Sequence, residues 1–166
     1  WNLVVWGNPI LPVEKVPANT LELLRALGFD SATSYVWIHH CWPADTCTAY
    51  NSVRDAYMAY WDKAKAEYGV PYYPNVTMGW DPSPRTNQQK DWNPAYGYPY
   101  SGILCDNIRA ALQMTKDRLL ADPDGPRILN INCWNEWTEG SYLEPDSVHG
   151  MKYLEAVRDV FADTKP

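Results

Sequence analysis

The stretch that decides the fold is NINCWNEWTEGSYLEP, residues 130–145. A short apolar run at residues 127–133 leads into it, after the turn signal DPDGP at residues 122–126, and this pattern predicts a buried strand. Glu136 and Glu139 follow directly, with Trp134 and Trp137 beside them. Reactive residues at the C-terminal end of a buried strand are typical of α/β barrels. Two close carboxyl groups can divide into an acid and a base, and indole rings offer flat faces to sugars. The residues alone therefore indicate a glycosidase-like site.

Along the whole chain, predicted strands and helices alternate four times. Strands are predicted at residues 3–6, 31–38, 71–78 and 127–133, and helices at residues 20–27, 52–67, 102–121 and 148–161. Such alternation predicts a parallel sheet, and each strand is followed by a loop with aromatic or ionisable residues. We therefore predict an α/β fold that forms the C-terminal half, about four βα units, of a (β/α)8 TIM barrel. The alternative is a four-stranded doubly wound α/β domain.

Local signals set the expected helix ends. The first helix should be capped by Asn19 or Thr20 and end at Gly28, with a buried face made of Leu21, Leu24 and Leu27. The second should begin at Asn51 or Ser52, the third at Ser101 or Gly102, and the fourth after a cap by Asp146 or Ser147. The loop at residues 82–99 is polar and rich in proline, as lids and binding loops often are.

Length and composition limit the classes of protein. The 166 residues suffice for one catalytic-type domain, residues 1–166, and we expect it to be incomplete at its N-terminus, with the first half of the barrel missing. The net charge of −6 argues against nucleic acid and anionic membranes as partners. No apolar segment is long enough to span a membrane. The excess of 9 Trp and 12 Tyr over 2 Phe favours a half-wet, carbohydrate-facing cleft. A secreted or periplasmic location is favoured, although the four cysteines do not decide it.

Two further loops carry candidate substrate-binding residues. Trp80, Asp81 and Arg85 follow the third predicted strand, where Asp81 could accept hydrogen bonds from sugar hydroxyls and Arg85 could hold Asp81 or the substrate. The alternative is an Asp–Arg pair that only braces the loop. Trp37 and His39 lie two residues apart near the end of the second predicted strand, so they should share a face that meets the sugar or, alternatively, the core.

The histidines and cysteines of the second loop do not form a recognisable metal motif. His39, His40, Cys41 and Cys47 lack the regular paired spacing of zinc ligands, so we expect no metal and no cofactor. Cys41 and Cys47 could instead close a small disulfide loop.

Several motifs together resemble a known family. The segments WNEWTEG (134–140), LEP (143–145) and YLEA (153–156) resemble the C-terminal signature of glycoside hydrolase family 99 and its WbsX-type relatives, which are often labelled glycosyltransferases. GWDPSPR (79–85) resembles the same wider group. The resemblance implies a barrel enzyme that cleaves glycosidic bonds in a polysaccharide or glycan with retention. For family 99 itself the bonds are α-mannosidic.

The resemblance also implies roles for the matching residues. Glu136 would be the base that takes the proton of the sugar 2-hydroxyl, and Glu139 the acid that protonates the leaving oxygen. The 2-hydroxyl would then attack C1 to give an anhydro sugar that water opens, whereas in the usual retaining scheme a carboxylate attacks. Trp134, Asn135 and Trp137 would contact the substrate, one tryptophan as a stacking platform and the other as a structural wedge. For Glu144, the third acid of this stretch, we expect a structural role.

A different class of function remains open on the sequence. The alternative is a glycosyltransferase-like or non-catalytic carbohydrate-binding protein of polysaccharide biosynthesis. A nucleotide-sugar site would need a cradle for the diphosphate, such as a glycine-rich loop at a helix start, and these 166 residues contain none.

Overall fold

The computed structural model describes residues 2–5, 24, 26–41, 48–85, 100–101 and 105–162, with only the backbone at residues 2–5, 100–101 and 105–106. Its main strands are all parallel. β1 (Asn2–Val5), β2 (Ser31–Ser34) and β4 (Tyr72–Tyr73) form one sheet in the order β1-β2-β4. β5 (Asn75–Thr77) continues the chain after Pro74 and pairs with β7 (Asn130–Asn132). β1 pairs with β2, β2 with β4, and β5 with β7, so residues from consecutive predicted strands lie side by side.

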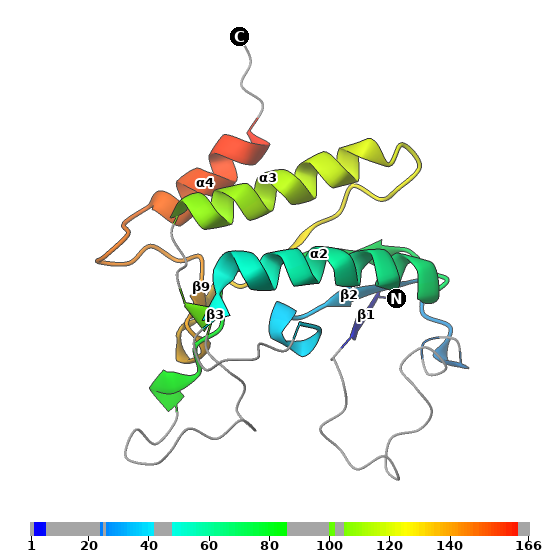
Figure 1. Ribbon diagram of the computed structural model, residues 1–166, viewed down its shortest axis with the longest axis horizontal. Helices are drawn as coiled ribbons and strands as arrows, with labels where there is room; N and C mark the ends of the chain where they lie inside the picture. The colour runs from blue at the N-terminus through cyan, green and yellow to red at the C-terminus, as the bar shows by residue number, and fades with distance from the viewer. Residues whose placement is uncertain are drawn as a thin grey trace.

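Three helices connect and cover these strands. They are α2 (Tyr50–Glu67), α3 (Cys105–Ala121) and α4 (Lys152–Phe161). α2 packs against α3, and α3 packs extensively against α4, so the three helices lie on the same side of the strands (Figure 1). The described residues thus form a mixed α/β domain with parallel strands, and they do not close into a barrel. None of the described helices is both long and apolar enough to cross a membrane.

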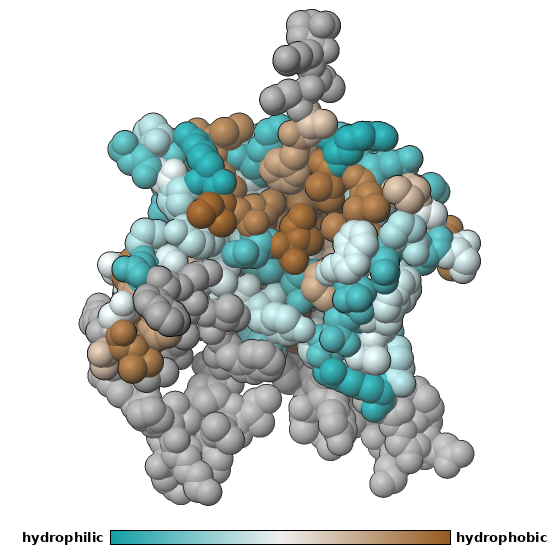
Figure 2. All heavy atoms as spheres, turned by 180° about the vertical axis from the view of Figure 1, so that it is seen from behind, coloured by the Kyte–Doolittle hydropathy of each residue, from teal (hydrophilic) through white to brown (hydrophobic). Residues whose placement is uncertain are grey.

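The core lies between these helices and the strands. α2 contributes an apolar face with helical spacing, made of Tyr50, Val53, Tyr57, Trp61 and Ala64. Val76 of β5 and Ile108 and Leu112 of α3 complete the packing. Seen from behind relative to Figure 1, the molecule has a patch of apolar side chains on its surface (Figure 2). Large apolar residues that stay exposed include Leu120, Ile128 and Phe161.

Two predicted elements are shorter than expected. The strand predicted at residues 31–38 ends at Ser34, and Trp37–His39 form a short 3-10 helix, η2. The strand predicted at residues 127–133 is reduced to β7, and Ile128 is 45% exposed. Both segments are apolar enough for a strand, but only the residues that find a hydrogen-bonding neighbour become one.

The helix starts also differ from the predicted caps. α2 begins at Tyr50 after Ala49, which makes no side-chain capping bond, so Asn51 and Ser52 lie inside the helix. α3 begins at Cys105, because Ser101 belongs to β6 (Tyr100–Ser101), which pairs with β3 (Thr48–Ala49). α4 begins only at Lys152.

The cap predicted for α4 closes a turn instead. The Asp146 carboxylate accepts hydrogen bonds from the amides of Val148 and His149, at 2.6 Å each, six residues before the helix begins. In the first predicted helix, Leu24 is buried as expected, but Leu27 is 62% exposed and does not belong to its buried face. The proposed caps Asn19 and Thr20, and Leu21, lie outside the described residues.

Candidate active site

The stretch that follows β7 folds into a small hairpin. β8 (Asn135–Glu136) pairs antiparallel with β9 (Ser141–Tyr142), and Trp137–Glu139 form a 3-10 turn, η5, between them. Gly140 ends this turn with φ +58°, a left-handed conformation that suits glycine. The hairpin thereby places Glu136 and Glu139 beside the C-terminal ends of β5 and β7.

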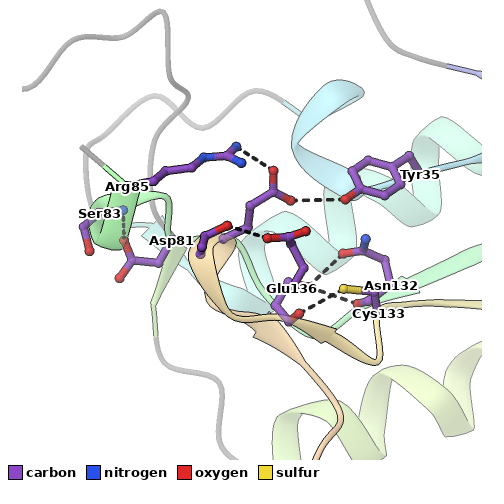
Figure 3. A network of polar contacts seen from close by, with 10 residues as sticks. Tyr35, Asp81, Ser83, Arg85, Asn132, Cys133 and Glu136 are labelled. Carbon is purple, nitrogen blue, oxygen red and sulfur yellow. Dashed lines mark hydrogen bonds and ion pairs between the residues drawn. The ribbon is translucent and has the colours of Figure 1, made fainter.

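Glu139 is the most enclosed acid of the site. It is only 6% exposed, and both carboxylate oxygens have partners. Arg85 Nη2 donates to Oε1 at 2.5 Å, and the Tyr35 hydroxyl donates to Oε2 at 3.2 Å. Arg85 and Tyr35 approach from opposite sides (Figure 3). Hydrogen bonds and an opposite charge stabilise the ionised form of a carboxyl group.

Tyr35 is suited to donate this hydrogen bond. Burial, together with the negative charge of Glu139, raises the pKa of Tyr35 to about 12. The phenol therefore keeps its proton throughout the neutral range. Tyr35 follows β2 directly, so three strand ends, those of β2, β5 and β7, contribute to the surroundings of one carboxylate.

The loop after β5 is tied to the hairpin at several points. The Asp81 amide donates to the Glu139 carbonyl oxygen at 2.7 Å, and the Asp81 side chain accepts a hydrogen bond from the Ser83 amide at 2.9 Å. A Cβ added at Gly140 would lie 2.9 Å from Asp81 Cβ, so these backbones are in close contact. The predicted contact between Asp81 and Arg85 is wrong. Arg85 binds Glu139 instead, and Asp81 stabilises its own loop.

Glu136 is more accessible than Glu139. Its side chain is partly buried, and Oε1 accepts a hydrogen bond from the Thr138 hydroxyl. Below it, the buried Asn132 accepts a hydrogen bond from the Ser141 hydroxyl at 2.8 Å, and the Cys133 thiol donates to the Ser141 carbonyl oxygen at 3.0 Å (Figure 3). This network fixes the end of β7 against β9. The Glu136 carboxylate takes no part in these bonds and is only partly buried.

Both tryptophans of the hairpin are exposed. Trp137 is 43% exposed, stacks on Tyr142 with ring centroids 3.8 Å apart, and donates from Nε1 to Glu144 at 2.9 Å. Trp134 is 51% exposed, so neither ring is buried as a wedge and the expected division of roles is not observed. Trp137 is held on one face and at its N–H, which leaves the other face available for a sugar. Glu144 acts here as a support for Trp137.

Three other predicted contact residues differ in their surroundings. Trp37 is fully buried and donates from Nε1 to the Asn75 carbonyl oxygen at 2.8 Å, so it is a core residue and its predicted contact with the sugar is wrong. Trp80 is 6% exposed and has the Arg85 guanidinium 5.7 Å from its ring centre, so it supports Arg85 more than it offers a platform. His39 lies between Tyr35 and Trp80, with ring centroids 6.0 and 6.2 Å away. Asn135, by contrast, is exposed.

Residues 39–41 form a half-buried, uncharged group. Burial lowers the pKa of His39 to about 4 and that of His40 to about 3, and it raises the pKa of the Cys41 thiol to about 12. Cys41 is a free thiol, and Cys47 lies outside the described residues. Within the described part of the chain, no group of three or more His, Cys, Asp or Glu residues could hold a metal.

A cavity of about 140 Å³ lies away from the glutamates. It is found between the C-terminal halves of α2 and α3 and is lined by Trp61, Tyr72, Arg118 and neighbouring residues. None of the candidate site residues lines it.

Sequence reasoning missed Tyr35, the most informative partner of Glu139. Tyr35 lies inside the second predicted strand, residues 31–38, and only the shorter observed β2 leaves it at a strand end, as the glutamates follow β7. In a parallel sheet such positions come together at one edge.

A protein-family model described as Glycosyltransferase WbsX matches residues 18–157. This match covers most of the chain, which therefore belongs to the WbsX family of carbohydrate-active proteins. Two relatives from Xanthomonas campestris pv. campestris, strains B100 and ATCC 33913, are both named Uncharacterized protein WxcX. Each is 38% identical over 87 residues, which are 52% of this chain and 12% of the relative. The matched segment thus corresponds to a small part of each relative.

Among solved structures, the chain is similar to the GH99 endo-alpha-mannosidase from Bacteroides thetaiotaomicron. The sequences are 15% identical, the TM-score is 0.46, and the match covers 84% of this chain and 40% of the mannosidase chain.

Proposed function

We propose that this chain carries the catalytic residues of a retaining glycoside hydrolase that cleaves a polysaccharide or glycan. The observation that carries the proposal is the pair of glutamates on one hairpin, one enclosed by Arg85 and Tyr35 and the other accessible. Membership of a carbohydrate-active family supports a glycan as the substrate.

The two acids then have different roles. Glu136, which is accessible and accepts a hydrogen bond from Thr138, is the base that takes the proton of the sugar 2-hydroxyl. Glu139 is the acid that protonates the leaving oxygen, as the resemblance to family 99 implies. In the arrangement described, Arg85 and Tyr35 both donate hydrogen bonds to the Glu139 carboxylate. Substrate binding therefore has to weaken at least one of these contacts before Glu139 can donate a proton.

The exposed indoles give the substrate a surface to lie on. Trp137, fixed by Tyr142 and Glu144, is the better-ordered platform, and Trp134 and Asn135 lie on the same hairpin. An aromatic ring held on one face loses little conformational entropy when a sugar stacks on the other.

We further propose that the strands are consecutive units of a (β/α)8 barrel. Two observations support it: the strands follow one another in sequence order, and the helices that connect them pack against each other on one side. A doubly wound sheet, in contrast, reverses its strand order at a switch point and carries helices on both faces. In a barrel the strand ends that surround Glu139 would all belong to the face where barrel enzymes hold their active sites.

A glycosyltransferase is the second candidate, because the family model carries that description. The two candidates are distinguished by assaying the full-length protein on a panel of glycans, with and without nucleotide sugars, and by analysing the products. The hydrolase proposal expects shortened glycans with retained anomeric configuration and no need for a nucleotide sugar. Elongated products that depend on a nucleotide sugar would establish the transferase instead.

A further inference from the structure

We infer that Tyr35 is a positioning residue that, together with Arg85, fixes the orientation of the Glu139 carboxylate, so that loss of its hydroxyl changes the pH dependence of activity. This inference rests on the proposed function, since it concerns the acid of that reaction. Tyr35 lies outside the motifs WNEWTEG and GWDPSPR.

The geometry gives each oxygen of Glu139 its own donor. Arg85 binds Oε1 and Tyr35 binds Oε2, so the carboxylate is held at both ends and cannot rotate freely. The Glu139 side chain is almost inaccessible to water, which means that the two donors replace most of its hydration. A hydrogen bond to a charged group in such surroundings is stronger than one in water.

The two donors differ in how firmly they are held. The Arg85 side chain is 45% exposed and reaches Glu139 from a loop, over the face of Trp80. Tyr35 follows β2 directly and packs beside His39, with ring centroids 6.0 Å apart and planes 29° from parallel. A substrate that displaces the exposed Arg85 would leave Tyr35 as the fixed donor. Tyr35 therefore keeps Glu139 oriented at the moment when it has to receive a proton.

The hydroxyl of Tyr35 can be removed while its ring contacts remain. Tyr35→Phe deletes the donor to Oε2, which favours the neutral acid over the carboxylate. If Glu139 acts as the acid, the alkaline limb of the kcat/KM–pH profile should move to higher pH by roughly 0.4–1 pH unit, the shift expected from one hydrogen bond of ordinary strength. A shift of the acidic limb instead would contradict the acid role of Glu139. An unchanged profile would overturn the positioning role of Tyr35.

The matched control is a tyrosine whose hydroxyl bonds far from the glutamates. Tyr68 OH lies 2.5 Å from Tyr60 OH, beside the C-terminal end of α2. Tyr68→Phe should leave both limbs of the profile in place, even where its effect on stability equals that of Tyr35→Phe. A shift of the same size in both variants would show that loss of packing, and not loss of the Glu139 contact, moves the profile.

A second measurement separates this inference from the proposed function. Thermal unfolding of full-length Tyr35→Phe, Glu139→Ala and the double variant tests the contact without any substrate. The losses in Tm should be non-additive, with the double variant at least about 2 °C more stable than the sum of the single losses predicts. Non-additive losses without turnover of any glycan would refute the proposed hydrolase and keep the Tyr35–Glu139 coupling. Additive losses would refute the coupling itself.

Discussion

Gly140 allows the sharpest structural test, because the chain contains a matched control for it. Both Gly140 and Gly150 have a left-handed backbone, with φ +58° and +59°. A Cβ at Gly150 would meet no atom within 4 Å, whereas a Cβ at Gly140 would lie 2.9 Å from Asp81 Cβ and 3.3 Å from the Asp81 carbonyl oxygen. Alanine at either position costs about 1–2 kcal/mol for the left-handed conformation. Only Gly140→Ala should add an overpacking cost, of about 1–3 kcal/mol.

The assay compares the two variants with the wild-type full-length protein by calorimetry and by glycan turnover. The difference between the variants cancels the shared backbone cost and leaves the contact with Asp81, which should lower Tm by roughly 2–8 °C more in Gly140→Ala than in Gly150→Ala. Turnover should fall only in Gly140→Ala, because separating the loops breaks the hydrogen bond from the Asp81 amide to Glu139. Equal Tm values and equal turnover in the two variants would refute the close packing of these loops.

Three further predictions concern other parts of the molecule. Trp137→Ala should weaken glycan affinity by roughly tenfold, about 1.4 kcal/mol, with little change in Tm, whereas replacing the buried Trp80 by alanine should mainly lower Tm. Calorimetric titration and melting curves check both variants. Unchanged affinity in Trp137→Ala would refute the role of Trp137 as a stacking platform. The pKa of His40 falls from an ordinary value of 6.5 to about 3, so the unfolded chain binds a proton that the folded chain does not. The free energy of unfolding should therefore decrease as the pH drops below 6.5, by about 1.4 kcal/mol per pH unit. Urea titrations between pH 6.5 and 4.5 should show that this free energy depends less on pH in His40→Phe, and equal slopes in the two proteins would contradict burial of a neutral imidazole. Residues 1–166 expressed alone should self-associate, because the outer edges of β1 and β7 lack a neighbouring strand among the described residues; a monodisperse monomer that unfolds cooperatively would instead favour the doubly wound alternative.

The order of strands and helices could be predicted because it depends on patterns that extend over many residues. The apolar face of α2 is built from five residues at helical spacing, and the predicted strands at residues 31–38, 71–78 and 127–133 are each followed by a helix. Short segments were less predictable. Trp37 was placed on a strand because residues 31–38 are apolar and rich in β-branched and aromatic side chains, yet those features do not separate a strand from a 3-10 turn that buries the same side chains.

The candidate site was predictable as a place but not as a set of contacts. Glu136 and Glu139 stand out in the sequence because two acids and two tryptophans follow one strand directly. The partner of Arg85 was not predictable in this way, because the choice between Asp81 and Glu139 depends on how two loops from different strands meet. Tyr35 contacts Glu139 across 104 residues of chain, and no local pattern reports such a contact.

The most direct test of the proposed function is turnover by the full-length protein after substitution of either glutamate. On the glycan that the panel identifies, Glu136→Gln and Glu139→Gln should each reduce the rate by about 10²–10⁴-fold, the usual contribution of general acid or base catalysis. The control Glu67→Gln, at the exposed end of α2, should have the wild-type rate. Melting curves should show that all variants are folded at the assay temperature, which excludes unfolding as the cause. Rates near the wild-type value in either site variant would contradict the assignment of Glu136 and Glu139 as the catalytic pair.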